Sequence, residues 1–309
     1  WKEIEVSCEA CHGPASRHVE WARRPTDDSA KGFDASLSAS IEKRWTFAPG
    51  TTVAQPVGRP ARVEVETCGR CHAARIPVWP DVRPGRPLLD THRVDLLSEG
   101  NYHADGQIFG EVFEYGSFLQ SRMYAKGVTC SNCHEPHSLK LRLPGNALCA
   151  QCHGPAYDTP NHHRHDPAKP GGRCIDCHMP SRLYMEIDRR RDHSFRVPRP
   201  DLTVKIGTPN ACGECHADRG AEWAAAAVDA WRGGRPSAPH WAAAIHAGRT
   251  WGAHAERLLV ATAENADFPP IARAAALSLI GRYVSRRSMA AIEHGAANAD
   301  PLLRLAAVE

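Results

Sequence analysis

Twelve cysteines in the chain fall into pairs whose members are separated by two residues, and a histidine follows the second cysteine of every pair. This spacing has a chemical reason, because two thiols on one helical turn can reach the two vinyl groups on one haem edge. The imidazole of the next residue then lies under the ring, where it can bind the iron. The pattern therefore predicts covalent attachment of c-type haem.

Six such motifs predict six haems c. The cysteines expected to form the thioethers are Cys8, Cys11, Cys68, Cys71, Cys130, Cys133, Cys149, Cys152, Cys174, Cys177, Cys212 and Cys215. The histidines expected as proximal iron ligands are His12, His72, His134, His153, His178 and His216.

Zinc is the main alternative for these cysteines. The spacing from Cys130 to Cys152 by itself fits a zinc ribbon, but zinc ribbons do not need a histidine after every second cysteine. With 18 histidines among 309 residues, chance does not place one after all the pairs. A redox or disulfide role meets the same objection.

A second ligand for each iron can come from histidines outside the motifs. Up to residue 216 these are His18, His92, His103, His137, His162, His163, His165 and His193. Bis-histidine ligation is therefore available at every haem, with methionine as the alternative distal ligand. One ligand is expected from the cluster at residues 162–165, with His162 favoured and the choice left open. The predicted distal set is His18, His92, His103, His137, His162 and His193.

The surrounding sequence must position these ligands with little conventional core. Residues 1–220 are rich in proline and glycine and show no sustained strand alternation. The porphyrins are therefore expected to form the core, and folding to depend on haem insertion. We predict a short helical turn at each motif, helices over 14–23, 90–100 and 108–126, and a short strand over 63–66.

The pattern changes near residue 221, where an alanine-rich stretch favours helix. Helices are predicted over 221–231, 239–249, 252–265, 269–284, 286–298 and 300–309. Pro270-Ile-Ala-Arg-Ala-Ala and Pro301-Leu-Leu-Arg-Leu-Ala repeat one another, which indicates an α-solenoid of the HEAT kind. An ordinary alanine-rich bundle is the alternative. The predicted fold is mainly α with much irregular loop: a hexahaem cytochrome c domain over 1–220, then an α-helical repeat region over 221–309.

Part of the chain resembles bacterial multihaem cytochromes of the cytochrome c554 and doubled Cys-x-x-Cys-His type, in particular those with a TPR- or HEAT-like region after the haems. The segments that carry the resemblance are 8–18, 102–107, 127–137, 190–195 and 207–216. The resemblance implies electron transfer, an exported, extracytoplasmic location, and distal roles for His18, His103, His137 and His193.

The expected function is electron transfer, because a haem iron with two nitrogen ligands has no position open for substrate. Expected partners are redox proteins or identical subunits that meet haem to haem, in a larger complex or a filament, with the helical repeat as a docking surface. The formal charge of +3 does not suggest nucleic acid, and no apolar stretch is long enough for a membrane span. The alternative is a nitrite- or hydroxylamine-type oxidoreductase with one open haem.

Overall fold

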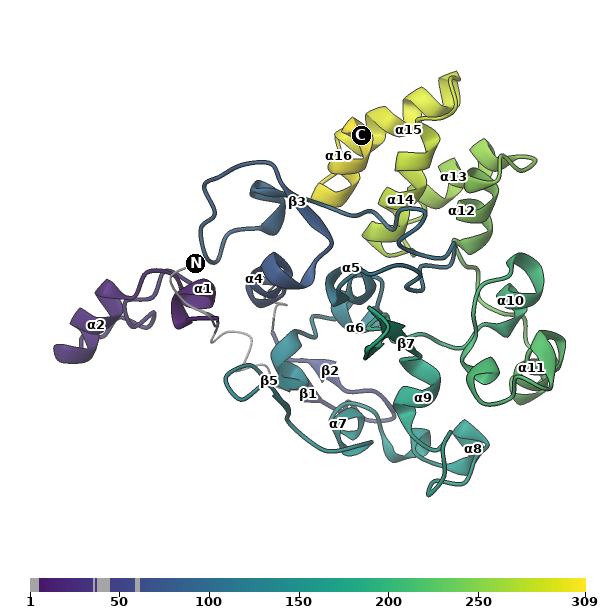
Figure 1. The fold of residues 1–309 in the computed structure, drawn as a ribbon, viewed down its shortest axis with the longest axis horizontal. Coiled ribbons are helices and arrows are strands. Elements are labelled where there is room, and N and C mark those ends of the chain that lie inside the picture. The colour runs from purple at the N-terminus through teal and green to yellow at the C-terminus, as the bar shows by residue number, and fades with distance from the viewer. Residues whose placement is uncertain (1–5, 36, 38–44, 59–61) are drawn as a thin grey trace. The chain divides into compact units, whose positions relative to one another are not determined.

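The computed structural model describes residues 6–35, 37, 45–58 and 62–309. Within these ranges the fold is mainly helical, with four small two-stranded antiparallel sheets (Figure 1). No helix in the described ranges is long and apolar enough to span a membrane. Contacts divide the chain into two compact units, residues 1–94 with 126–155, and residues 95–125 with 156–309.

The first unit consists of short elements joined by loops. Its described helices and strands are α1 (Cys8–His12), α2 (Ser16–Arg23), β1 (Trp45–Thr46), β2 (Gln55–Pro56), α4 (Val63–His72), β3 (Arg75–Pro77), η1 (Leu88–Asp90), β4 (His92–Val94), η2 (Cys130–Asn132), β5 (His134–Glu135), β6 (Lys140–Leu141) and α7 (Ala147–Ala150).

The second unit holds the longer helices. Its elements are α5 (Glu114–Phe118), α6 (Arg122–Ala125), α8 (Pro160–His163), α9 (Cys174–His178), β7 (Ser181–Tyr184), β8 (Asp188–Arg191), α10 (Pro200–Ile206), η4 (Ala211–Glu214), α11 (Gly220–Trp231), α12 (Ala242–Arg249), α13 (Ala255–Glu264), α14 (Pro270–Ile280), α15 (Arg286–Ala296) and α16 (Pro301–Val308), while η3 (Pro155–Tyr157) lies at the junction.

The strand predicted over 63–66 is wrong, because these residues open helix α4. The alternation of valine and glutamate resembles a strand, but the helix also carries the Cys68–His72 motif, whose spacing requires a helical turn. Val65 is 2% exposed, and the neighbouring Glu64 is buried too. Both faces of the segment are therefore buried, which a half-exposed strand does not allow.

The helix predicted over 90–100 is also wrong. Its first part forms β4, which pairs with β3. The Asp95 carboxylate then accepts hydrogen bonds from the Ser98 backbone N–H (2.8 Å) and the Asn101 side chain (2.5 Å), and Leu97 has a φ of 56°. Such side-chain bonds compete with helix. The long helix predicted over 108–126 is reduced to α5 and α6.

The helices predicted after residue 220 are confirmed, with slightly shorter bounds, as α11 to α16. Figure 1 shows α12 to α16 side by side in the green-to-yellow part of the chain. Each contacts its neighbour in sequence, and α14 also contacts both α12 and α16. Several side chains of α13, α14 and α16 are fully buried, among them Leu259, Ile271, Leu277, Ile280 and Leu303.

The two copies of the internal repeat use their arginines alike. Arg273 on α14 donates from Nε to the Ala263 carbonyl at the end of α13 (2.9 Å). Arg304 on α16 donates from Nη1 to the Asn298 carbonyl just after α15 (2.7 Å). Arg273 thus satisfies a carbonyl of the last turn of α13, which has no intrahelical partner, whereas Arg304 bonds the loop that follows α15.

The compact units follow a different division from the predicted boundary after residue 220. Residues 95–125 belong with the C-terminal helices. Arg249 on α12 explains part of this, because its guanidinium donates to the carbonyls of Tyr102 (2.7 Å) and Leu97 (2.6 Å). These bonds tie the helical stack to a loop that precedes it by about 150 residues in sequence.

A substitution of Gly116 on α5 tests how closely the segment that contains Tyr102 packs in this unit. A Cβ at this position would lie 2.5 Å from the Tyr102 hydroxyl and 3.9 Å from Ile271 Cδ1. We expect Gly116→Ala to lower the free energy of unfolding by about 1–3 kcal/mol, the usual cost of overpacking. Urea denaturation followed by circular dichroism measures this. Gly281→Ala is the control, since its nearest atom is 3.6 Å away; equal stability of the two variants would contradict the prediction.

Candidate haem-binding sites

All six Cys-x-x-Cys-His motifs begin on a helical turn, as predicted: on α1, α4, η2, α7, α9 and η4. Helices α1, α4 and α9 contain the whole motif, whereas η2, α7 and η4 end before the histidine. Four of these turns, α1, α7, α9 and η4, contain no buried residue. The C-terminal helices, in contrast, are packed against one another through buried apolar side chains. The motif turns are therefore held in place by something other than an ordinary apolar core.

Three motif histidines each face a histidine from outside the motifs. The ring centroids are 6.4 Å apart for His12 and His137, 6.1 Å for His178 and His162, and 6.2 Å for His216 and His165. The first two pairs are close to parallel, at 9° and 12°. A metal–imidazole bond of about 2.0–2.1 Å puts two imidazoles on opposite faces of one ion about 6.3 Å apart between ring centres. The residues present therefore fit an iron between each pair.

The histidine cluster at residues 162–165 brings two rings, rather than one, against motif histidines. Helix α8 presents His162, and its cap Arg164 has a φ of 61°. This left-handed residue reverses the chain, so that His165 reaches a different motif. His163 supports it, because its carbonyl oxygen is 2.5 Å from His165 Nδ1. The sequence alone did not indicate the reversal, since arginine seldom adopts a positive φ.

Several histidines use Nδ1 for a backbone carbonyl. The distances are 2.8 Å from His18 to Lys31, 2.9 Å from His193 to Arg191 and 2.5 Å from His178 to Arg196. A bond from Nδ1 to a carbonyl fixes the tautomer, as is usual for a metal-ligating histidine. His18 and His193, which are predicted distal ligands, both make such a bond.

His103 and His92 have other surroundings. The Arg182 guanidinium donates to His103 Nε2 (3.1 Å), the nitrogen that an iron would need. Burial lowers the pKa of His103, which favours this neutral acceptor form. His92 is 6% exposed, and its Nδ1 lies 2.9 Å from the Thr91 hydroxyl. The geometry favours Arg182, not iron, as the partner of His103.

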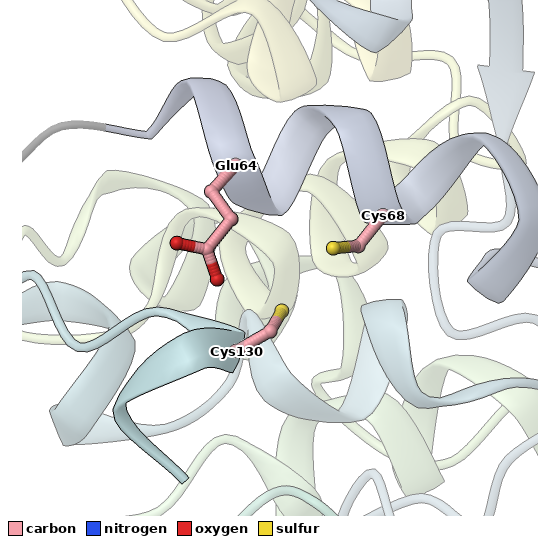
Figure 2. A group of neighbouring side chains, drawn as sticks. All are labelled: Glu64, Cys68 and Cys130. Carbon is pink, nitrogen blue, oxygen red and sulfur yellow. The ribbon is translucent and has the colours of Figure 1, made fainter. Parts of the chain in front are cut away.

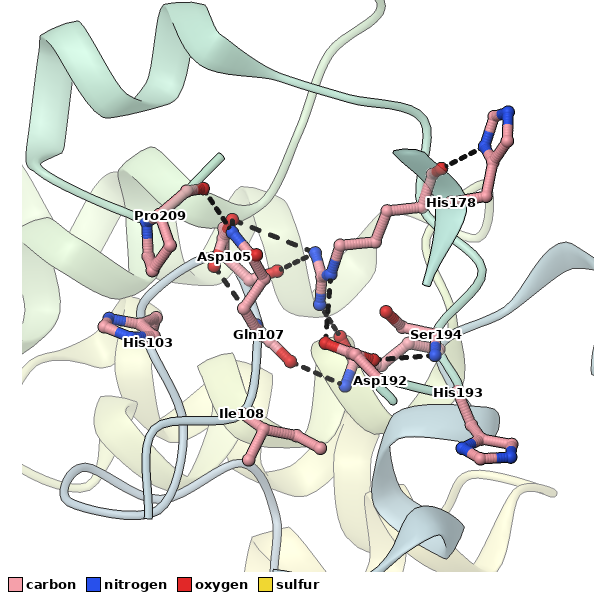
Figure 3. A network of polar contacts seen from close by, with 12 residues as sticks. His103, Asp105, Gln107, Ile108, His178, Asp192, His193, Ser194 and Pro209 are labelled. Carbon is pink, nitrogen blue, oxygen red and sulfur yellow. Dashed lines mark hydrogen bonds and ion pairs between the residues drawn. The ribbon is translucent and has the colours of Figure 1, made fainter. Parts of the chain in front are cut away.

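A buried polar network around Asp105, Gln107 and Asp192, which Figure 3 shows, was not predicted from the sequence. Arg196 is its centre. Its guanidinium donates to the Asp105 carbonyl (2.9 Å) and to Gln120 Oε1 (3.1 Å), and lies 3.5 Å from the Asp192 carboxylate. Its backbone N–H donates to the carbonyl of His178, whose ring bonds back to the Arg196 carbonyl. The arginine therefore fixes the orientation of a motif histidine.

The same network joins segments that the resemblance singled out. Gln107 donates from Nε2 to the Pro209 carbonyl (2.6 Å) and to the Asp105 carboxylate (2.7 Å), as Figure 3 shows. Asp105 and Asp192 are 4% and 5% exposed at their side chains. The sequence did offer one signal for these two aspartates, because each lies within two residues of a predicted ligand.

At two motifs the pKa of a cysteine thiol is not that of a redox cysteine. Burial raises the pKa of Cys133 and of Cys177 to about 11. Reactive and redox cysteines have lowered thiol pKa values. This argues against the redox reading at these positions.

Comparisons with known proteins agree with the motif. Residues 123–157, which contain the third and fourth motifs, match the family model described as the doubled CXXCH motif. The motifs and this match support one class of protein. It is a multihaem c-type cytochrome.

Two relatives show how far the cytochrome resembles known chains. It is 23% identical over 219 residues to the dissimilatory sulfite reductase MccA of Wolinella succinogenes; the match covers 68% of this chain and 27% of that protein. The chain thus spans about a quarter of the relative's length. The solved structure of the outer cell wall cytochrome OcwA aligns with a TM-score of 0.47 at 17% identity, over 97% of this chain and 69% of that one.

Proposed function

We propose that this cytochrome transfers electrons through six covalently attached haems c, most of them with two histidine ligands. The observation that carries the proposal is the spacing of the three imidazole pairs, 6.1 to 6.4 Å between ring centroids. The residue pairs that would hold three of the irons are His12 with His137, His178 with His162, and His216 with His165. His18, His92 and His193 are the proposed distal ligands of the other haems, and His103 is left out because Arg182 occupies its Nε2.

Haem iron with two imidazole ligands accepts and releases single electrons without binding substrate. The protein residues keep that coordination in place. The turn at the start of each motif would place its histidine near the iron, and carbonyl bonds at Nδ1 would hold the imidazole tautomers. The backbone N–H and carbonyl of residue Arg196 hold His178. Rigid ligands also lower the reorganisation that accompanies each change of charge.

The proposal extends to the setting of the protein. The haem count and the relatives favour an extracytoplasmic location and a redox protein as partner. The C-terminal helices, read as a HEAT-like repeat, are the proposed docking surface, supported by the matching roles of Arg273 and Arg304. Assembly of identical subunits through haem contact is a further prediction, which the mass of the native holoprotein in solution tests.

The oxidised holoprotein separates this function from that of an oxidoreductase with an open haem. We expect purely low-spin electronic and resonance Raman spectra and an uptake of six electrons on reductive titration. A high-spin band, together with cyanide binding by the untreated protein, would instead show an open iron and favour the enzyme.

A further inference from the structure

Two haem-attachment motifs of the first unit lie close together at their first cysteines. Cys68 comes from helix α4, and Cys130 begins the η2 turn. Their sulfurs and the Glu64 carboxylate all lie within 4.8 Å of one another, and Figure 2 shows the three side chains converging from the two elements.

Glu64 joins the two elements. Its carboxylate accepts a hydrogen bond from the Ser131 backbone N–H (2.5 Å) and another from the Ser131 hydroxyl (2.8 Å). The two residues are 6% and 5% exposed and stand 67 positions apart in the sequence. A carboxylate with two hydrogen bonds from one residue fixes both the distance and the orientation of its partner.

Hydrogen bonds within the η2 turn also hold its conformation. The Thr129 backbone N–H donates to Asn132 Oδ1 (2.8 Å), and a capping box closes the turn. Arg142 donates from Nε to the Ser131 carbonyl. Hydrogen bonds thus hold both the N–H and the C=O of Ser131. A shift of Glu64 on α4 is therefore expected to shift the neighbouring Cys130 as well.

The Glu64 side chain is buried although it lies in the first turn of a helix. Acidic residues in the first turn of a helix are usually exposed, where they interact with the helix dipole at no desolvation cost. A carboxylate in the interior is costly unless its hydrogen bonds compensate. Here both bonds go to the residue that follows a haem-attaching cysteine, so the side chain is placed to control the spacing of two motifs.

We propose that Glu64 is a positioning residue that holds the second and third haem-attachment motifs so that the sulfurs of their first cysteines stay within 4.8 Å of each other, which would make the two attached haems a closely coupled pair. The proposal rests on the proposed function. Each sulfur would be joined to its porphyrin through a single carbon atom, so sulfurs held within 4.8 Å would bring the edges of the two attached haems close together. Such a pair would be coupled for electron transfer.

Circular dichroism of the purified holoprotein in the Soret region reports this coupling, because neighbouring haems give a paired positive and negative signal. Glu64→Ala and Glu64→Asp, which removes one methylene of reach, are expected to lose part of this signal while all six haems stay attached. Glu64→Gln keeps an acceptor for the backbone N–H and a donor for the hydroxyl, so it should restore the wild-type signal.

Glu66→Gln is the matched control. It lies on the same helix, and its carboxylate accepts a hydrogen bond from the Leu88 backbone N–H (2.9 Å). An unchanged Soret signal in a shortened variant that carries six haems overturns the proposal. So does failure of both shortened variants to accumulate with haem, since Glu64 would then serve folding, and so does stoichiometric zinc at these atoms. Absence of haem from the wild type would instead refute the proposed function.

Discussion

Substituting His137 by alanine is expected to turn one low-spin haem into a high-spin one. The His137 and His12 rings are nearly parallel with centroids 6.4 Å apart, so the variant removes the proposed sixth ligand of a single iron. The remaining motif histidine leaves that iron five-coordinate or bound to water. Electron paramagnetic resonance of the oxidised protein should show one high-spin centre among six, and the reduced variant should bind carbon monoxide.

The control for this substitution is His294→Ala, since His294 is exposed and its Nδ1 lies 3.6 Å from the Glu264 carboxylate on the C-terminal helices. This variant should keep the wild-type spectrum. A low-spin spectrum for His137→Ala, with full haem content, would exclude His137 as a ligand.

The histidine cluster makes a sharper form of the same test. His162→Ala and His165→Ala should each produce one high-spin haem, and the double variant two, because the rings face different motif histidines. His163→Ala should leave the ligand count unchanged. If only one of the first two variants changes spin state, the cluster supplies a single ligand, as its sequence suggested.

Replacing Arg196 by methionine is expected to destabilise the second unit strongly. The arginine side chain is 12% exposed between two nearly buried aspartates, Asp105 and Asp192. Removing the cation leaves their charges uncompensated, which costs about 3–5 kcal/mol. The urea midpoint, followed by far-ultraviolet circular dichroism, measures the loss.

Two further variants separate charge from geometry at this site. Arg196→Lys keeps the charge but offers no planar fork, so it should recover only part of the stability. Lys205→Met removes a cation 3.6 Å from Asp201 whose side chain is 68% exposed, and should cost less than about 1 kcal/mol. Equal effects of Arg196→Met and Lys205→Met would refute a structural role for the network.

The sequence predicted the features that depend on local spacing. The motif turns and the helices after residue 220 follow from short-range patterns and are present. The strand over 63–66 failed because these residues belong to the same helix as the Cys68–His72 motif. The helix over 90–100 failed because β4 pairs with β3 and the Asp95 carboxylate bonds the loop that follows. Intrinsic propensity does not include such contacts.

The candidate sites show the same limit. Histidines could be counted from sequence, but their pairing depends on where the chain turns, as the left-handed Arg164 shows between His162 and His165. His103 looked like a ligand by its setting, yet Arg182 comes to its Nε2 from 79 residues away. Residues that support the sites without belonging to a motif, such as Arg196, are identified only by the structure.

The mass of the denatured polypeptide tests the central claim most directly. Thioether bonds survive denaturation, so the intact protein should exceed its polypeptide mass by six haems, one for each Cys-x-x-Cys-His motif. The pyridine haemochrome assay should give the same number. A mass equal to the polypeptide alone, or zinc in place of iron in metal analysis, would contradict the account.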